Sequence, residues 1–334
     1  MALRNASLHG KARPRKMKHM LVMEVGSFEG VRVRVPATIA NLGSGFDVLG
    51  IALTWHNTVE ARYAERMRKP IIEVEGEGEN ELPRDERNVC YRAFSAACEL
   101  MGEETPSIFM RLRNTIPLSR GLGSSAAARV GGIVAAMALL RGEVDENKAL
   151  KLAAELEGHT DNVAPALLGG FVISGWKSDD DSVFAIKLPM AKDVLVTVLV
   201  PEHHIPTETA RSVLPESVSL SDAVFNMSRA CLLVGAFITG HLEHIAEAVK
   251  DKLHQPYRQA LMPWLNDVIE TAMSAGALGA FLSGSGSAVA ALSADEAKAS
   301  QVAKAMEMAL SRHGVHGYTK VVRIDTDGVR FERW

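Results

Sequence analysis

The first half of the chain shows strand-type patterns interrupted by one strong helical pattern. Apolar and basic residues alternate over 31–35, which predicts a strand with one face in solvent. Apolar residues recur at helical spacing over 88–101, which predicts an amphipathic helix. Three further runs are predicted to be strands: 53–62, 71–75 and 107–113. Strands mixed with helices in this way indicate an α+β fold.

A change of composition near Pro189 divides the chain. The strand predicted over 194–200, which is apolar apart from Thr197, marks the start of a second domain. We therefore predict an N-terminal domain over 23–190 and a C-terminal domain over 191–334. The remaining predicted elements are helices at 126–140, 150–156, 221–239, 241–253, 258–274 and 294–313, and strands at 171–174, 279–282, 288–292 and 318–324.

The first 22 residues are basic and have no acidic partner before Glu24. This segment lacks the apolar core of a signal peptide. We predict that residues 1–22 form a disordered basic tail and that folded structure begins near Met23.

Composition narrows the class of protein. The 334 residues suit two domains of ordinary size, and 47% hydrophobic and 23% charged residues are typical of globular proteins. A net charge of -3 gives no electrostatic case for binding nucleic acid. The three cysteines, Cys90, Cys98 and Cys231, are too widely spaced to indicate a disulfide framework or a zinc site, which favours a cytoplasmic location. No uncharged run is expected to span a membrane, since 276–292 is rich in Gly and Ser and 130–140 is too short.

A glycine-rich segment leads directly into the helix of small residues predicted over 126–140. Gly121 and Gly123 leave backbone N–H groups open, and a serine follows where the helix begins. Open N–H groups at a helix N-terminus form an anion site, and a nucleotide phosphate is the expected anion. A glycine turn that only packs the helix is the alternative. The motif GxxxxGK[ST] is absent from the sequence, and the dinucleotide fingerprint does not fit because Pro117 interrupts the strand that it requires.

Several polar residues have both a functional and a structural interpretation. Asp47 lies among apolar residues, where a lone carboxylate is costly unless it meets a cation such as a ligand ammonium. The alternative is that Asn41 and Asp47 only form a turn. His159 and Asp161 have three interpretations: a base and its orienting carboxylate, a pair of metal ligands, or polar loop residues that cap a helix. The last is the commoner case. The glycine–serine segment 283–287 by itself indicates only a hairpin connection.

Three stretches taken together are more specific than any one of them. The segments 36–50, 117–127 and 283–287, in this order and spacing, resemble the three motifs of the GHMP small-molecule kinases. The run from Glu157 to Ala166 is similar to a signature of the homoserine kinases within that family. The resemblance covers nearly the whole chain outside the basic tail.

This resemblance implies a two-domain fold, with an N-terminal domain similar to domain 2 of ribosomal protein S5 and a ferredoxin-like C-terminal domain. It implies ATP-dependent phosphorylation of the L-homoserine hydroxyl to O-phospho-L-homoserine in threonine biosynthesis, with Mg²⁺ as a cofactor. The implied partners are L-homoserine and ATP, without nucleic acid or membrane, and the oligomeric state is open between a monomer and a homodimer. The alternatives are another alcohol kinase of the family, such as a mevalonate-like enzyme, and a ligand-binding relative without catalysis.

The resemblance also implies roles for individual residues. It implies Ser125 and Glu155 as Mg²⁺ ligands and Asn162 as the residue that orients the attacking hydroxyl, so these three are the expected catalytic residues. The implied substrate contacts are Asn41 and Asp47 for the amino group, Thr207, Arg211 and Arg258 for the carboxylate, and Asn162 for the hydroxyl. The implied ATP-binding loop comprises Pro117, Leu118, Ser119, Arg120, Gly121, Leu122, Gly123, Ser124, Ser125, Ala126 and Ala127, supported by a second loop of Ser283, Gly284, Ser285 and Gly286.

Overall fold

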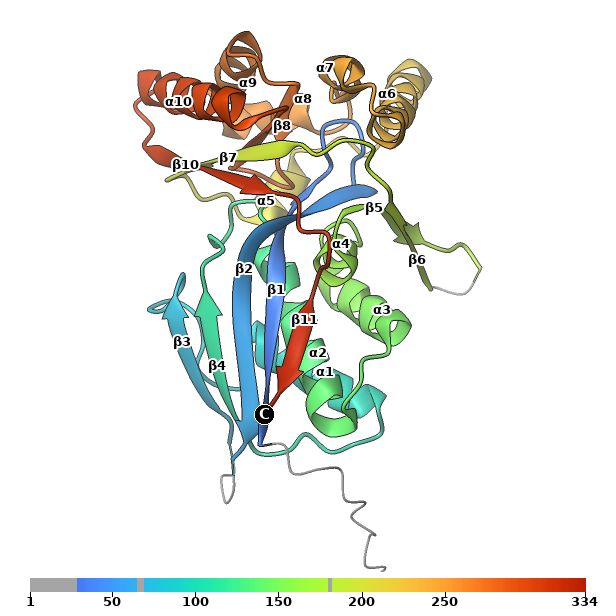
Figure 1. Cartoon of the computed structure of the whole chain (residues 1–334), viewed down its shortest axis with the longest axis vertical. Helices are drawn as coiled ribbons and strands as arrows, with labels where there is room; N and C mark the ends of the chain where they lie inside the picture. Colours follow the sequence, from blue (N-terminus) through green and yellow to red (C-terminus); the bar gives the residue numbers. More distant parts are fainter. Residues whose placement is uncertain (1–28, 65–68, 180–181) are drawn as a thin grey trace, which may run out of the picture.

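The computed structural model describes residues 29–64, 69–179 and 182–334, and the predicted basic tail lies outside the described residues. Two β-sheets meet near the middle of the molecule, each with helices packed against it (Figure 1). The first sheet is built mainly from the N-terminal half of the chain and the second from the C-terminal half. The predicted two-domain α+β architecture is therefore confirmed.

The first sheet has seven strands. Its main path runs β11–β1–β2–β4–β3, while β5 pairs with one end of β2 and with β6. Neighbouring strands are antiparallel except β3 and β4. The strands are β1 (Gly30–Ala40), β2 (Leu49–Tyr63), β3 (Ile71–Gly76), β4 (Ile108–Asn114), β5 (Phe171–Trp176), β6 (Val183–Leu188) and β11 (Arg330–Arg333). Strands β6 and β11 were not predicted from the sequence.

Strand β1 is longer than the predicted 31–35 because it continues past a proline. The pairing of β1 with β2 shifts register between Pro36 and Ala37, and such a bulge is where a sheet accommodates proline. The strand then runs on to Ala40 and delivers the next residue, Asn41, to the region between the two sheets.

Helix α2 (Ser124–Arg141) is the central helix of the N-terminal domain, and 67% of it is buried. Its small residues allow close packing: a Cβ added at Gly132 would lie 2.1 Å from the carbonyl oxygen of Cys90 on α1 (Val89–Leu100). Among the described residues, α2 and α6 (Leu220–Thr239) are long and apolar enough to cross a membrane by composition, but only 22% of α6 is buried. For α2, the apolar composition serves the core. The other helices of this domain are α3 (Glu146–Glu157) and α4 (Val163–Leu168).

The second sheet is a four-stranded antiparallel sheet with the order β10–β7–β9–β8. Its strands are β7 (Leu195–Pro201), β8 (Gly279–Leu282), β9 (Val289–Ser293) and β10 (Gly317–Arg323). Numbered within this sheet alone, the order is 4–1–3–2, and helices α9 (Leu265–Ser274) and α10 (Glu296–Arg312) complete a split β-α-β arrangement. The expected ferredoxin-like domain is therefore present.

The helical insertion between β7 and β8 differs from the prediction. The helix predicted over 241–253 is wrong: the chain forms a 3₁₀ turn (Leu242–His244), the short helix α7 (Ile245–Ala248) and then a loop. The carboxylate of Asp251 accepts the backbone N–H groups of Leu253, His254 and Gln255, and such bonds compete with continuation of the helix.

The helix predicted over 258–274 is also divided. The chain forms α8 (Gln255–Arg258), a 3₁₀ turn (Gln259–Leu261) and α9, because Pro263 disfavours helical geometry at the residue before it.

The chain does not end at the strand predicted over 318–324. It crosses back to the first sheet, where β11 pairs with β1. Asp325 fixes this crossing: one carboxylate oxygen lies 2.6 Å from His56 Nε2, and the other accepts the backbone N–H groups of Asp327 and Gly328, both at 2.9 Å. The two domains are therefore joined by the crossover at the start of β7 and by this returning segment.

The Asp325 contacts predict a pH-dependent contribution to stability. Burial alone would raise the pKa of Asp325, but the bond from His56 and the N–H of Gly328 outweigh it and hold the pKa below its usual range. The stabilisation is therefore present above the unfolded pKa of about 3.9 and is lost as the pH falls through the lower folded pKa. Asp325→Asn should reduce the free energy of unfolding at pH 7 by about 1.5–3 kcal/mol. Urea unfolding at pH 7 and at falling pH should show this difference shrinking in acid, whereas the exposed Asp327→Asn should change little.

Candidate active site

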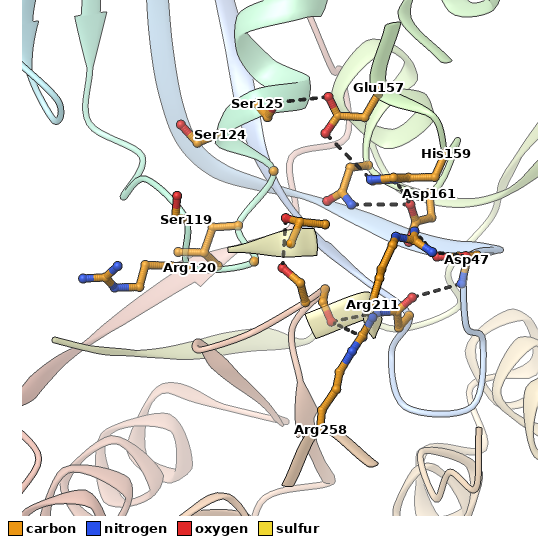
Figure 2. Close-up of a pocket in the computed structure, with 18 residues that line it drawn as sticks. Asp47, Ser119, Arg120, Ser124, Ser125, Glu157, His159, Asp161, Arg211 and Arg258 are labelled. Carbon is orange, nitrogen blue, oxygen red and sulfur yellow. Dashed lines mark hydrogen bonds and ion pairs between the residues drawn. The ribbon is translucent and has the colours of Figure 1, made fainter. Parts of the chain in front are cut away.

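A polar cavity of about 230 Å³ lies where the two sheets meet (Figure 2). Six segments line it: the β1–β2 loop, the glycine loop before α2, the α3–α4 connection, α5 (Thr207–Ser212), α8 and the β8–β9 loop. The cavity therefore brings together all three of the segments whose order and spacing were singled out in the sequence. Its lining residues are Asn41, Asp47, Ser119, Arg120, Gly121, Leu122, Gly123, Ser124, Ser125, Glu157, His159, Asp161, Asn162, Thr207, Arg211, Arg258, Gly284 and Ser285.

The glycine loop presents the open N-terminus of α2 to this cavity. Gly123 is the N-cap residue, in the left-handed conformation at φ 67°, and no side chain caps the first turn. The first N–H groups of the helix are therefore available to an anion. A Cβ at Gly121 would lie 2.0 Å from the carbonyl oxygen of Ser283, and the Ser283 hydroxyl donates to the Gly121 carbonyl oxygen at 2.6 Å. The 283–286 loop thus packs directly against the glycine loop.

Arg120 belongs to the predicted ATP-binding loop, but its side chain anchors the loop instead of facing an anion. Its Nε donates to the Pro201 carbonyl oxygen at 2.7 Å and Nη1 donates to the Leu118 carbonyl oxygen at 3.3 Å. The guanidinium is nearly buried, and this burial lowers its pKa. In Figure 2 it extends away from the other labelled side chains.

A second cavity of about 210 Å³ lies on the other side of the glycine loop. It shares Ser119, Ser124 and Ser125 with the polar cavity, but its remaining walls are mostly apolar. This cavity was not predicted from the sequence, because its walls come from β2, the 82–90 segment, β4 and α2, which no local pattern connects. Besides the three shared serines, the lining residues are Asn57, Val59, Leu82, Pro83, Asn88, Val89, Cys90, Leu112, Asn114, Leu118, Ala127 and Ala128.

The carboxylate beside Ser125 is Glu157 and not the predicted Glu155. The Ser125 hydroxyl donates to Glu157 Oε2 at 3.1 Å, and Arg129 contacts both side chains. Glu155 is half-exposed and lies 3.8 Å from Lys151 on the outer face of α3. Successive helix residues are rotated by about 100°, so two residues two positions apart point in nearly opposite directions. The prediction that Glu155 lies beside Ser125 is therefore wrong.

Opposite charges gather at the other end of the polar cavity. Arg211 donates to both carboxylate oxygens of Asp47, at 2.9 and 3.0 Å. The side chain of Arg258 is 2% exposed, donates to the Gly284 and Ala210 carbonyl oxygens, and has its pKa lowered to about 10, mainly by burial. Asn41 accepts the backbone N–H of Asp47 at 3.0 Å. Residues far apart in sequence thus form one site that carries both signs of charge, as the resemblance implied.

Thr207 lies at the same end of the cavity, one helical turn from Arg211. Its hydroxyl is 3.4 Å from that of Ser285. Helix α5 is therefore joined to the 283–286 loop through Thr207 and to the β1–β2 loop through Arg211.

The α3–α4 connection contributes a hydrogen-bonded group of side chains. His159 Nδ1 lies 2.7 Å from Asp161 Oδ1, and the hydroxyl of Thr38 donates to Asn162 Oδ1 at 2.7 Å. Burial alone would lower the pKa of His159, but the bond and charge of Asp161 outweigh it and the pKa is raised. Asn162 is the N-cap of α4 but makes no side-chain capping bond. The side-chain bonds described for His159 and Asp161 link them to each other and to Asn162, with none to the first turn of α4.

Comparisons with known proteins agree with this arrangement. The family model described as the GHMP kinases N-terminal domain matches residues 88–170, and the GHMP kinases C-terminal model matches residues 233–311. The chain is 45% identical to a homoserine kinase of Carboxydothermus hydrogenoformans, over 85% of this chain and 91% of that protein. It is 40% identical to a homoserine kinase of Desulfitobacterium hafniense, over 89% and 98%.

Solved structures show the same likeness. The crystal structure of a homoserine kinase from Cytophaga hutchinsonii matches with a TM-score of 0.83 at 32% identity, covering 91% of this chain and 98% of that one. An L. major mevalonate kinase solved with R-mevalonate matches with a TM-score of 0.67 at 12% identity, covering 88% of this chain and 95% of that one. The second likeness concerns the fold alone.

Proposed function

The chain belongs to the homoserine kinases of the GHMP kinase family, and from this premise we propose how its site transfers the γ-phosphoryl group of ATP to the side-chain hydroxyl of L-homoserine. The product is O-phospho-L-homoserine, an intermediate of threonine biosynthesis. The observation that carries the proposal is the paired arrangement of an open helix N-terminus and, in the same cavity, a carboxylate with two guanidinium groups. This arrangement suits a phosphate donor next to a zwitterionic amino acid.

The glycine loop would hold the phosphates of ATP. Its backbone N–H groups and the N-terminus of α2 supply donors and positive potential without a lysine. The adjoining apolar cavity would take the adenine base, since it opens on the same serines of the loop and is walled by apolar side chains. The nucleotide would then extend from the apolar cavity to the polar one across Ser124 and Ser125.

The charged end of the polar cavity would bind L-homoserine. The carboxylate of Asp47 and the side-chain amide of Asn41 face the ammonium group, and Arg258 and Arg211 provide guanidinium donors for the carboxylate. Thr207 would add a hydroxyl contact. The side-chain hydroxyl of the substrate would then point toward the glycine loop and Asn162, which line the same cavity.

The donor set beside the glycine loop fits Mg²⁺. A carboxylate and a hydroxyl are hard oxygen donors, and Mg²⁺ in nucleotide sites takes one or two protein ligands and completes its shell with phosphates and water. We propose Ser125 and Glu157 as these ligands, in place of Ser125 and Glu155; Arg129 contacts both and would have to move. When bound, the ion neutralises negative charge on the phosphates.

The residues near the acceptor hydroxyl would act mainly by positioning. Phosphoryl transfer passes through a loose transition state, so early deprotonation of the hydroxyl is not needed. Thr38 occupies the side-chain oxygen of Asn162, and one amide hydrogen makes a long bond of 3.4 Å to Asp161 Oδ1. The second amide hydrogen is then the donor that would meet the substrate hydroxyl. Asp161 already accepts from His159 and is 1% exposed, which makes it an orienting group.

Asp161→Asn should keep most of the activity, and Asn162→Ala should lose more, because the substrate hydroxyl loses its positioning contact. The same Asp161 change removes the carboxylate that raises the pKa of His159, so that pKa should fall below its ordinary value. NMR titration of the His159 ring and pH profiles of kcat would measure both effects. Loss of about 10²–10⁴-fold in Asp161→Asn, together with loss of the acidic limb, would instead identify Asp161 as a general base.

A coupled assay of ADP release against a panel of hydroxylated compounds tests the function directly. L-Homoserine should be turned over best, well ahead of L-serine, mevalonate and galactose, because only an amino acid of this length uses both signs of charge and reaches the phosphate. Faster turnover of mevalonate or of an uncharged sugar would overturn the assignment in favour of another alcohol kinase of the family.

We further propose that two copies associate through α6. One face of this helix exposes Leu220 (80%), Val224 (50%), Met227 (59%) and Ile238 (39%). Together with the exposed Cys231, they recur at intervals of four, three, four and seven residues, which is the spacing of a helix-pairing seam. Light scattering should give the mass of a dimer for the unmodified chain and of a monomer for Met227→Glu; a monomer in both cases would contradict the proposal.

A further inference from the structure

A fully buried histidine outside the polar cavity lies between the two charged halves of the site. His254 precedes α8 and is 0% exposed. Its Nε2 lies 2.8 Å from the Gly43 carbonyl oxygen in the β1–β2 loop, and its Nδ1 lies 3.2 Å from Nη1 of Arg258. The mechanism above gives this residue no role. Its two ring nitrogens nevertheless contact the segment that carries Asp47 and the guanidinium of Arg258.

These two contacts define the protonation state of His254. A carbonyl oxygen can only accept, so Nε2 carries the hydrogen that is donated to Gly43. A guanidinium can only donate, so Nδ1 must present its lone pair to Arg258. The ring is therefore neutral, with its hydrogen on Nε2, which also lies 3.5 Å from Oδ2 of the buried Asp251. Burial lowers the pKa of His254 and so favours this neutral form.

The loop that His254 contacts has an unusual backbone conformation that its neighbours must maintain. Asn41, Leu42 and Asp47 all have positive φ values, of 70°, 49° and 57°, which residues other than glycine rarely adopt. The C-terminal domain holds the loop from outside: the Ser44 hydroxyl donates to the Ala248 carbonyl oxygen at 2.7 Å. A Cβ at Gly43 would lie 1.9 Å from the Val249 carbonyl oxygen, so the contact is backbone on backbone.

The aromatic ring of this loop adds a second contact with His254. The ring of Phe46 stacks on the imidazole, with centroids 5.2 Å apart and an interplanar angle of 23°. The same Phe46 ring lies 5.4 Å from the guanidinium carbon of Arg258 and 5.9 Å from that of Arg211. Phe46 and His254 therefore form a layer beneath both guanidinium groups.

His254 is itself held rigidly. The carboxylate of Asp251 accepts the backbone N–H groups of Leu253, His254 and Gln255 at 2.7–3.0 Å, and also the side-chain amide of Asn226 at 2.9 Å. These bonds satisfy the buried carboxylate and fix the backbone from which the imidazole projects. The position of the ring is therefore set independently of the substrate.

We propose that His254 is a positioning residue that fixes the distance between the ammonium-binding loop around Asp47 and the carboxylate-binding Arg258. The inference rests on the proposed function and adds to it a residue that makes the enzyme recognise both charged groups of its substrate together. Each ring nitrogen serves one half of the site, so the two halves can be separated by substitution. The amide nitrogen of glutamine replaces Nε2, and the side-chain oxygen of asparagine replaces Nδ1.

The test compares three variants with three acceptors. L-Homoserine carries both charges, 4-hydroxybutanoate lacks the ammonium group, and 3-aminopropan-1-ol lacks the carboxylate. His254→Phe keeps a stacked ring but loses both polar contacts, and it should lower kcat/KM for L-homoserine by about 10–100-fold, mainly through KM, with the KM for ATP unchanged. The preference of the enzyme for L-homoserine over each single-charge acceptor should shrink in the same variant.

The two amide variants should divide this effect. His254→Gln keeps the bond to Gly43 and should retain discrimination against 4-hydroxybutanoate while losing discrimination against 3-aminopropan-1-ol. His254→Asn keeps the bond to Arg258 and should show the reverse. His56→Phe, which alters a largely buried histidine bonded to a carboxylate outside the site, is the matched control and should leave all three acceptors as in the unmodified enzyme.

The outcomes separate the inference from the proposed function. If the unmodified enzyme does not phosphorylate L-homoserine, the proposed function fails. If it does, but His254→Phe keeps the parameters for all acceptors, the positioning role is wrong. Equal losses toward L-homoserine and ATP, with a lower melting temperature, would also overturn the proposal, because they would indicate a purely structural histidine.

Discussion

Glu157→Gln should lower kcat by about 10²–10³-fold while the protein stays folded, which corresponds to the loss of about 3–4 kcal/mol of charge stabilisation in the transition state. The structure gives the reason: Glu157 is the carboxylate that the Ser125 hydroxyl contacts, and its side chain is 9% exposed. The amide keeps the shape but removes the negative charge that a hard cation requires. Kinetics over a range of Mg²⁺ concentrations should show a higher metal requirement in this variant.

Glu155→Gln is the matched control for this experiment. It makes the same chemical change two residues away on the same helix, where the side chain is half-exposed and forms an ion pair with Lys151. Surface ion pairs of this kind contribute about 0–1 kcal/mol, so both kcat and the metal requirement should stay near those of the unmodified enzyme. A large loss of kcat in Glu155→Gln, with normal activity in Glu157→Gln, would contradict the assignment of Glu157 as the Mg²⁺ ligand.

Arg258→Ala should raise the KM for L-homoserine by about 30-fold or more, since removing one partner of a buried charged pair costs about 2–5 kcal/mol. The KM for ATP should remain nearly unchanged, because Arg258 lies at the end of the cavity away from the apolar pocket. Arg211→Ala should give a smaller change in the same direction, as its side chain is 38% exposed. Initial-rate measurements with each substrate varied in turn would separate the two effects.

Arg229→Ala provides the control for the arginine substitutions. Arg229 also pairs with a carboxylate, Glu247, but on α6, outside the cavity. Its removal should leave both KM values unchanged. Because Arg258 also bonds two carbonyl oxygens of the fold, thermal unfolding of Arg258→Ala should be measured as well. A weaker affinity for ATP with normal affinity for L-homoserine would show that the amino acid site lies elsewhere.

The periodicity of apolar residues predicted the helices and strands that depend mainly on their local sequence. Helix α2 and strand β7, which is apolar apart from Thr197, are nearly as long as expected, since continuous runs of small or apolar residues are stabilised by burial in the core. Strand β11 has the sequence Arg-Phe-Glu-Arg, whose pattern is too short and too polar to be recognised. It forms because β1 offers an edge to pair with, which is a property of the completed sheet.

The site shows the same division between local and long-range information. The glycine loop could be recognised as an anion site because consecutive residues make it. The contact of Asp47 with Arg211 joins residues 164 positions apart. The resemblance to a family assigned both residues to one substrate site but did not predict that they bond to each other. The error at Glu155 arose because the resemblance placed a glutamate on a helix without fixing which face it occupies. His254 gave no signal at all, because its role depends on contacts with a loop 211 residues away.

The bidentate bond between Asp47 and Arg211 has a consequence for how the site selects its ligand. On the proposed function, Asp47 binds the ammonium group of the substrate and Arg211 binds its carboxylate. In the free enzyme each side chain therefore occupies the position on its partner that a charged group of the substrate would take. Only molecules in which this pair is open can bind the substrate. The apparent affinity for the substrate is therefore the intrinsic affinity multiplied by the fraction of molecules in which the pair is open. A zwitterion replaces both halves of the bond, whereas a ligand with one charge leaves a side chain unpaired. The ion pair between Asp47 and Arg211 in the free enzyme thus selects against singly charged metabolites, even those small enough to fit the cavity.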